Sequence, residues 1–586
     1  MKLLKKNNNP INHEKNINEL ISLSIDINNE NNKDIINYSN IIYSFFVNNY
    51  NFLLDNKNFY NRDRVITDNY NLSPIFYGSY FLSGADGDFE NLKDIDFIKN
   101  NYNYFVVNPD AICYSVGAAI GEKHARGLIN SNAVQYNVYA IVSEENVLNS
   151  LSIEASRFAG LYKLDNLIIV TCTSNVQNIK SIYEALSFSV FTSSNNYDSI
   201  TSSFNDALKS GKPSIILVDD MNFNYDTNDV SLVKKNLNVR DMPFTVSNDV
   251  MEDFQYLIDN RVSDLEKRFQ KPITELDSDS SITLKSLMLN NKRISSNNIV
   301  FIPEEGESLV SLTNKLMDSY YENSKILIGA YTGDNANKES IITPDDYSNN
   351  RIDFSDFKYS SAYILNGLCE SGFRPYLFTD SYLYRYFISA SFYATSKKLP
   401  IIYVIENNEK HAYDMSYLRA GDTDLFTPFD SNELLGSMKA VMTKEEGVSA
   451  ILVSNTSATS SVSTSINNSI KGGYVLCNEK LNFDGIIISS GSSIKLAKEV
   501  SDILFSRGHD LRVVSITNLK RFLTQDSFYQ DEVLPVEKRK IIIENSNSSY
   551  WNKIVFNSKY ILNYKDFDEL KNDPKLFAEK IESILK

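Results

Sequence analysis

Short apolar runs that alternate with helical stretches are the feature that most limits how this chain can fold. Tyr139–Val142, Leu167–Val170 and Ser214–Val218 each have the length and apolar character of a buried strand. Such runs are typical of parallel sheets, because helices cover both faces of the sheet and leave no solvated side. The pattern predicts an α/β fold with parallel sheets flanked by helices.

The same pattern occurs again twice along the chain. A second set of predicted strands is Ile326–Ile328, Pro375–Phe378, Ile401–Ile405 and Ala450–Val453, and a third is Gly485–Ile488, Asp510–Ser515 and Lys540–Ile543. A chain of 586 residues exceeds what one hydrophobic core usually serves. We therefore predict an N-terminal domain, a polar linker, a middle domain and a C-terminal domain, with the boundaries 1–258, 259–298, 299–465 and 466–586.

Within the first set, Val147–Ala159 has the apolar spacing of one helix, and Gly160 is a suitable stop. The segment 105–111 between predicted elements contains no glycine and is interpreted as an ordinary strand-to-helix connection.

Charge and composition exclude several classes of protein. The formal net charge of -16 repels phosphate backbones, so nucleic-acid binding is not expected. No stretch has the roughly 18 apolar residues of a membrane helix, and the charged start of the chain is not followed by the apolar region of a secretion signal. The four cysteines lack the spacing of a metal knuckle or disulfide framework. We expect a soluble, cytoplasmic protein.

Several segments, taken in order, are similar to one enzyme family. Asn61–Ile66, Val116–Lys123, Gly372–Tyr376 and Gly472–Leu476 resemble motifs of the transketolases. The resemblance implies a dimer of three-domain chains with a diphosphate-type (PP), a pyrimidine-type (Pyr) and a C-terminal domain. It also implies thiamine diphosphate with a divalent metal, usually magnesium, and transfer of a two-carbon ketol unit between ketose and aldose phosphates in the pentose phosphate pathway.

The resemblance assigns candidate metal and cofactor ligands to two loops. Glu144 stands where transketolases have the metal-binding Asp, Ser174 where they have the Asn, and Val176 where a backbone carbonyl completes the site. Asn175 replaces Ser174 if the loop is shifted by one residue. Two glycines that flank the Asp in the family are Ser143 and Glu145 here. The alternative interpretation is a solvated acidic loop.

The resemblance also gives candidates for the group that relays a proton on the cofactor. Neither Lys358 nor Phe357, which align with the family's Glu, is an acid, and a local insertion would put Asp356 there instead. An exposed aspartate is the alternative. Of the residues that align with the aromatic wall around the pyrimidine, namely Asp380, Leu383 and Tyr386, only Tyr386 keeps its chemistry.

Groups that would hold a sugar phosphate are scarce. Asn455 aligns with one phosphate-binding arginine of the transketolases, and Thr313 or Asn314 aligns with the other. Arginine is the side chain that grips phosphate through paired, charge-assisted hydrogen bonds. The chain has four histidines, His13, His124, His411 and His509, and His411 is expected in an exposed loop.

Because these positions depart together, the leading hypothesis is a catalytically impaired or inactive transketolase-like protein. It would have a structural or regulatory role, as a homodimer or with an intact paralogue, and need no cofactor. The alternative is a divergent, active transketolase with thiamine diphosphate and Mg²⁺, in which Asp356 relays the proton. A third hypothesis is a scaffold for another small ligand in the inter-domain cleft.

Overall fold

The computed structural model describes residues 10–585 except 29–31, 86–87, 103, 296–298, 300, 334–339, 408–417, 419–422, 462 and 547–548. The chain forms two compact units. Unit 1 contains residues 1–290, 342–349 and 363–372, and unit 2 contains residues 291–341, 350–362 and 373–586.

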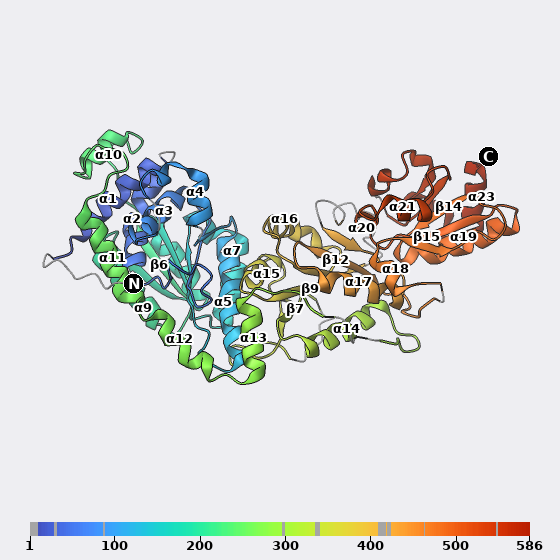
Figure 1. Cartoon of the computed structure of the whole chain (residues 1–586), viewed down its shortest axis with the longest axis horizontal. Coiled ribbons are helices and arrows are strands. Elements are labelled where there is room, and N and C mark those ends of the chain that lie inside the picture. The colour runs from blue at the N-terminus through green and yellow to red at the C-terminus, as the bar shows by residue number, and fades with distance from the viewer. Residues whose placement is uncertain are drawn as a thin grey trace. The chain divides into compact units, whose positions relative to one another are not determined.

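Unit 1, most of which is blue to green in Figure 1, is built on a parallel sheet. The strand order of this sheet is β2-β1-β3-β4-β6-β5. Its strands are β1 (Arg64–Thr67), β2 (Val106–Val107), β3 (Val138–Ile141), β4 (Leu167–Thr173), β5 (Ser189–Ser193) and β6 (Ser214–Asp219). The strands β3, β4 and β6 are the three that the apolar runs predicted.

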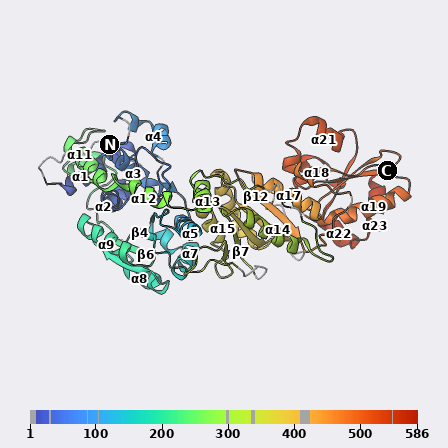
Figure 2. The same ribbon diagram turned by 60° about the horizontal axis from the view of Figure 1, so that its bottom comes forward.

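Helices cover both faces of this sheet, because successive strand residues point to opposite sides. Ile168, Val170 and Cys172 of β4 pack into a large core with helices α1 (His13–Ile27), α2 (Asn32–Asn48), α3 (Ser73–Leu82), α9 (Tyr197–Lys209) and α11 (Asn248–Val262). Helix α5 (Ala111–Ile129) lies against β1, β3 and β4, and α7 (Ser150–Leu161) packs on α5 (Figure 2).

Two glycines let α5 and α15 (Ser361–Glu370) cross closely. A Cβ atom on Gly117 would lie 1.8 Å from the carbonyl oxygen of Ile364, and one on Gly367 would lie 1.9 Å from that of Tyr114. Both distances are far below van der Waals contact, so only glycine fits at either position. Gly117 belongs to Val116–Lys123, one of the segments in which the sequence resembles transketolases.

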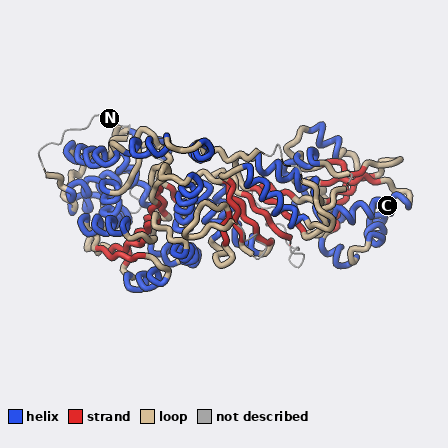
Figure 3. The backbone as a smooth tube through the Cα atoms, turned by 90° about the horizontal axis from the view of Figure 1, so that it is seen from below, coloured by secondary structure: helices blue, strands red, loops and turns tan. Residues whose placement is uncertain are grey.

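Unit 2 contains the second and third sheets, whose strands are red in Figure 3. The second is parallel with the order β11-β12-β10-β9-β7-β8, formed by β7 (Leu327–Tyr331), β8 (Arg351–Asp353), β9 (Arg374–Asp380), β10 (Ile402–Asn407), β11 (Asp424–Phe426) and β12 (Ser449–Ser454). The third has the order β13-β15-β14-β16-β17, formed by β13 (Tyr474–Cys477), β14 (Gly485–Ser489), β15 (Leu511–Ser515), β16 (Lys540–Ile543) and β17 (Ile561–Leu562). Only β13 is antiparallel to its neighbour among the described strands.

A buried glutamate joins the second and third sheets. Glu433 of α17 (Ser431–Thr443) accepts hydrogen bonds from the Tyr474 hydroxyl at 2.7 Å and the Ser515 hydroxyl at 2.6 Å. Its other carboxylate oxygen accepts from the backbone N–H of Phe429 at 2.8 Å. Burial raises the pKa of Glu433 to about 7, although these hydrogen bonds act to lower it.

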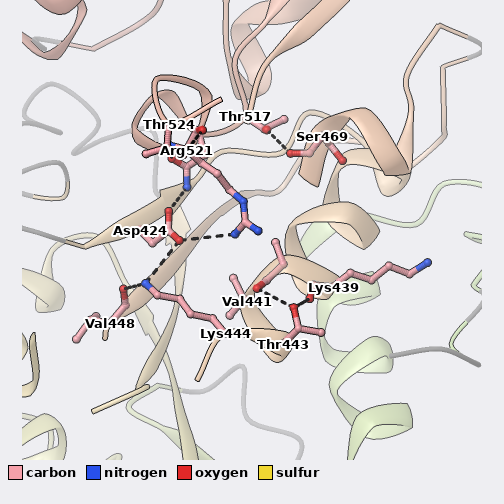
Figure 4. A network of polar contacts seen from close by, with 12 residues as sticks. Asp424, Lys439, Val441, Thr443, Lys444, Val448, Ser469, Thr517, Arg521 and Thr524 are labelled. Carbon is pink, nitrogen blue, oxygen red and sulfur yellow. Dashed lines mark hydrogen bonds and ion pairs between the residues drawn. The ribbon is translucent and has the colours of Figure 1, made fainter. Parts of the chain in front are cut away.

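A second polar network links β11 to α20 (Leu519–Phe522) in the same unit (Figure 4). The Asp424 carboxylate accepts from the Asn518 amide and lies 3.5 Å from the Lys444 ammonium and 3.9 Å from the Arg521 guanidinium. Burial lowers the pKa of Lys444, and Asp424 opposes this shift. The Asp424 carboxylate therefore forms ion pairs with two cations, Lys444 and Arg521.

The predicted helix Val147–Ala159 is wrong in one respect, because the structure contains two helices there. Asn149 separates α6 (Glu144–Leu148) from α7, and its side chain caps α7 by accepting from the Ser152 N–H at 2.8 Å. Gly160 lies inside α7, where a Cβ would lie 1.9 Å from the Leu186 carbonyl oxygen. The glycine therefore serves close packing rather than helix termination.

The segment predicted as a polar linker contains regular structure. Helices α12 (Leu265–Thr274) and α13 (Ser278–Met288) occupy much of it, and they bury Phe269 and Leu287. The division into these four segments stays a prediction.

Candidate functional site

The end of β3 carries the first loop of the candidate site. Ser143 follows this strand and caps α6, since its hydroxyl accepts from the Asn146 N–H at 3.2 Å. The N–H and hydroxyl of Ser143 both donate hydrogen bonds to the carboxylate of Asp68, which follows β1. The hydrogen bond from the N–H is 2.9 Å long. The loops after β1 and β3 are thereby tied to each other by protein groups.

The second loop follows β4 and meets Glu144 through Thr173. The Thr173 hydroxyl donates to Glu144 at 2.5 Å and accepts from the Asn175 N–H at 2.8 Å. Ser174 and Asn175 are exposed, and Val176 is the half-buried first residue of α8 (Val176–Ala185). Glu144 and the loop with the three predicted ligands thus lie together at the carboxyl ends of neighbouring strands.

Carboxylates dominate the charge at this edge of the sheet. Burial raises the pKa of Asp68, the bonds from Ser143 oppose the shift, and the negative charge of Glu145 adds to it. Asp34 of α2 accepts from the side-chain amides of Asn69 and Asn71 at 2.9 and 3.0 Å. Across the described part of the chain, no lysine or arginine forms an ion pair with Asp68 or Glu144.

The segment 105–111 is the strand-to-helix connection that the sequence predicted, running from β2 into α5. The buried amide of Asn146 holds it in place. Its nitrogen donates to the Pro109 carbonyl at 2.7 Å, and its oxygen accepts from the Ile112 N–H at 3.4 Å. Val106 and Val107 are half-buried. These protein groups satisfy one another where a glycine-rich loop would leave backbone N–H groups for a phosphate.

Asp356 and Tyr386, the candidate proton-relay acid and aromatic wall, lie in unit 2. Asp356 is exposed in the turn after β8. Tyr386 is 47% exposed and contacts two other tyrosines, with ring centres 5.0 Å from Tyr359 and 6.2 Å from Tyr382. A hydrogen bond with Tyr382 is the main cause of its raised pKa. Asp380 accepts from the N–H groups of Tyr382 and Leu383, both at 2.8 Å.

Uncharged residues occupy the positions that align with the phosphate-binding arginines of transketolases. Asn455 is exposed after β12, and the buried Thr313 donates its hydroxyl to the Leu309 carbonyl at 2.7 Å within its helix.

Of the histidines, His124 is buried with its Nδ1 2.7 Å from the Tyr347 carbonyl oxygen, and burial lowers its pKa to about 4. His13 stacks on Tyr197. His411 lies outside the described residues.

Sequence reasoning missed Asp68, Asn146 and Thr173, which hold the loops of the candidate site together. Asp68 directly follows β1, Thr173 is the last residue of β4, and Asn146 lies near the start of α6. Polar residues are common at this carboxyl edge of a parallel sheet. Strand-end position was the available signal.

Comparison with known proteins shows which family the chain is similar to. Residues 472–580 match the family described as transketolase-like C-terminal domain. The chain is 23% identical to the probable transketolase of Streptococcus pneumoniae, with 89% of this chain and 90% of the relative covered. It is 22% identical to the transketolase of Mycoplasma genitalium, with 93% of this chain and 94% of the relative covered. The chain is therefore similar to transketolases over about nine tenths of its length, and residues 472–580 match their C-terminal domain.

Solved transketolases share the fold of this chain. The enzyme from Leishmania mexicana matches with a TM-score of 0.87 and 16% identity over 98% of both chains. The enzyme from Campylobacter jejuni matches with a TM-score of 0.82 and 18% identity, covering 97% of this chain and 99% of the other. The predicted family resemblance and α/β class are both confirmed.

A membrane-spanning helix is not found among the residues that the structure describes.

Proposed function

We propose that this transketolase-like chain has lost most or all thiamine-dependent ketol transfer and has a structural or regulatory role. The observation that carries the proposal is the pair of hydrogen bonds from Ser143 to Asp68. They use the N–H and hydroxyl at the head of the candidate metal loop, and they place a carboxylate beside Glu144.

Charge argues against a diphosphate at this edge. Two unit charges 4 Å apart interact by about 1 kcal/mol in water and by roughly 4 kcal/mol near a protein surface. Asp68, Glu144 and Glu145 would each repel a diphosphate. A divalent ion would offset part of this repulsion, but the residues do not fit the cofactor, since Asn146 also fastens the connection that would have to open for phosphate oxygens.

The second candidate function is a divergent transketolase that moves a two-carbon ketol unit between ketose and aldose phosphates. Relatives named transketolase that match over most of their length favour it. So does the position of Glu144 beside the loop that contains Ser174, Asn175 and the Val176 carbonyl. In this case Mg²⁺ and thiamine diphosphate would bind there, Asp356 would relay the proton, and Tyr386 would contact the pyrimidine.

The same proposal covers location and partners. We place the protein in the cytoplasm as a homodimer, or as a heterodimer in which an intact paralogue supplies the complete cofactor loops. Its activity would then be exerted through the paralogue.

Calorimetry with thiamine diphosphate and Mg²⁺ tests the proposal on the full chain. We expect no binding heat at this edge at millimolar cofactor. Glu144→Gln is the matched variant, since it keeps the size of the side chain and the acceptor for Thr173 while it removes the charge. Micromolar binding that Glu144→Gln abolishes, together with ketol transfer from a ketose phosphate, would establish the enzyme instead. Heat that Glu144→Gln leaves unchanged comes from another site.

A further inference from the structure

A cavity of about 490 Å³ lies in unit 1 beside β1 and β2, which contribute Arg64, Ile66 and Val106 to its lining. Helices α5 and α13 contribute Tyr114 and Leu287 to its wall. Its volume lies in the range of small-molecule sites.

The cavity is positively charged in an acidic protein. Lys57, Arg62 and Arg64 line it, whereas Glu370 is the one acidic residue among the described residues of its lining. Within the described residues, none of these three cations forms an ion pair. The chain as a whole carries a formal charge of -16, so this concentration of unpaired cations contrasts with the rest of the sequence.

Backbone carbonyls fix the guanidinium of Arg64 without neutralising it. It donates to the carbonyl oxygen of Tyr60 at 3.0 Å and to that of Arg62, and its central carbon lies 4.2 Å from the ring centre of Tyr136. Burial lowers the pKa of Arg64, and the positive charge of Arg62 acts in the same direction. A guanidinium in this position is therefore preorganised for an anion.

Arg62 has a donor that no protein group satisfies. One of its terminal nitrogens donates to the Tyr104 carbonyl at 3.4 Å, but its Nε is buried and has no hydrogen-bond partner. The neighbouring Asp63 does not serve it, because that carboxylate accepts from the N–H groups of Asn51 and Asn137 at 2.9 and 2.7 Å. A buried charged donor without a partner costs free energy, so the protein's own groups do not fully satisfy this guanidinium.

The rest of the wall combines aromatic and aliphatic side chains with the polar residues Asn58, Asn290 and Ser371. Tyr60, Tyr104 and Tyr114 line the cavity, with Val106 and Leu287 among the apolar groups. Aromatic and aliphatic surface next to a cationic end suits a ligand with an anionic end and an apolar body.

We propose that this cavity binds an organic phosphate, whose phosphate contacts Arg62, Arg64 and Lys57 and whose apolar or aromatic part packs on the tyrosines. The proposal does not depend on the proposed function: Lys57, Arg62 and Arg64 are not among the candidate metal, cofactor or catalytic residues, and of the residues discussed for the candidate site Val106 alone is in the cavity lining.

Phenyl phosphate is the test probe, and calorimetry on the full chain measures its binding. We expect one saturable site that binds phenyl phosphate more tightly than inorganic phosphate, because only the ester fills the apolar part. Arg62→Gln should weaken binding at least about tenfold, since it removes a charge-assisted contact. Arg293→Gln is the control: this exposed arginine belongs to unit 2 and does not line the cavity.

Lys57→Gln keeps the test decisive if Arg62→Gln does not fold, since Lys57 is exposed and its replacement leaves the core intact. Raising the ionic strength should also weaken binding. Absence of binding at millimolar phenyl phosphate, or equal affinity in Arg293→Gln and a folded Arg62→Gln, overturns the proposal.

Thiamine diphosphate is itself an organic phosphate, so its titration separates the two proposals. Heat that disappears in Arg62→Gln but persists in Glu144→Gln belongs to this cavity.

Discussion

Replacing Glu433 by glutamine should change how the stability of unit 2 depends on pH. The folded-state pKa of about 7 lies above the ordinary value of 4.5, so the folded chain keeps a proton on Glu433 that the unfolded chain has lost. Between these two pH values the free energy of unfolding falls as pH rises, and the loss is complete above pH 7. The pKa difference corresponds to about 3 kcal/mol.

Glutamine removes this dependence while it preserves most of the local contacts. Its amide oxygen accepts from Tyr474 and Ser515 as the carboxylate does, while its NH₂ group faces the Phe429 N–H. That last contact lowers stability by the same amount at every pH. Relative to the wild type, Glu433→Gln should therefore gain about 3 kcal/mol between pH 4.5 and pH 7, whatever its offset.

Fluorescence of Trp551, the single tryptophan, reports the transition during urea unfolding. Its ring is buried in the third sheet's domain and donates to Glu544. The difference in the free energy of unfolding between variant and wild type cancels the contributions of other buried groups. One of these is His124, whose lowered pKa makes stability rise with pH. Glu445→Gln, an exposed glutamate of the same unit, is the control. Parallel pH profiles for wild type and Glu433→Gln would refute the reasoning.

Two further substitutions test the helix crossing and the candidate loops. Gly117→Ala would place a Cβ 1.8 Å from the Ile364 carbonyl oxygen, so it should lower the free energy of unfolding by about 2 kcal/mol or more. Gly333→Ala is the control and should change this free energy little, because a Cβ there meets nothing within 4 Å. Equal losses for the two variants in chemical denaturation would contradict the close crossing of the helices. Replacing Ser143 and Glu145 together by glycine removes a hydrogen bond to the neighbouring loop and one negative charge, so binding of thiamine diphosphate with Mg²⁺ should become measurable by calorimetry at millimolar cofactor, where the wild type gives none. Absence of binding in this variant would count against the electrostatic part of the proposed function.

Most central strands were predictable, with β1 as an exception, whereas the edge strands were not. Runs such as Leu167–Val170 are buried on both faces of a sheet and therefore read as continuous apolar sequence. The edge strands β2, β8 and β17 have only two or three residues each, too few for any periodic signal. The break at Asn149 was missed because apolar spacing continues across it, while an asparagine side chain that caps the next helix decides the local backbone.

The candidate site was predictable only in part. Glu144 and the loop after β4 were placed by resemblance, and their proximity follows from neighbouring parallel strands. Their hydrogen-bond partners were missed, because Asp68 and Asn146 come from other strands and helices whose distances no local pattern contains. The roles assigned to the candidate ligands and catalytic groups stay predictions, namely those of Glu144, Ser174, Asn175, Val176, Asp356 and Tyr386.

The way the chain passes repeatedly between its two units limits how it can be cut into pieces. Unit 1 needs residues 342–349 and 363–372 as well as residues 1–290. A fragment that stops at residue 290 would expose the glycine face of α5 and leave the His124 ring without the Tyr347 carbonyl. Gene fragments expressed separately should therefore yield an insoluble first half, and complementation by co-expression would require both halves to fold as one.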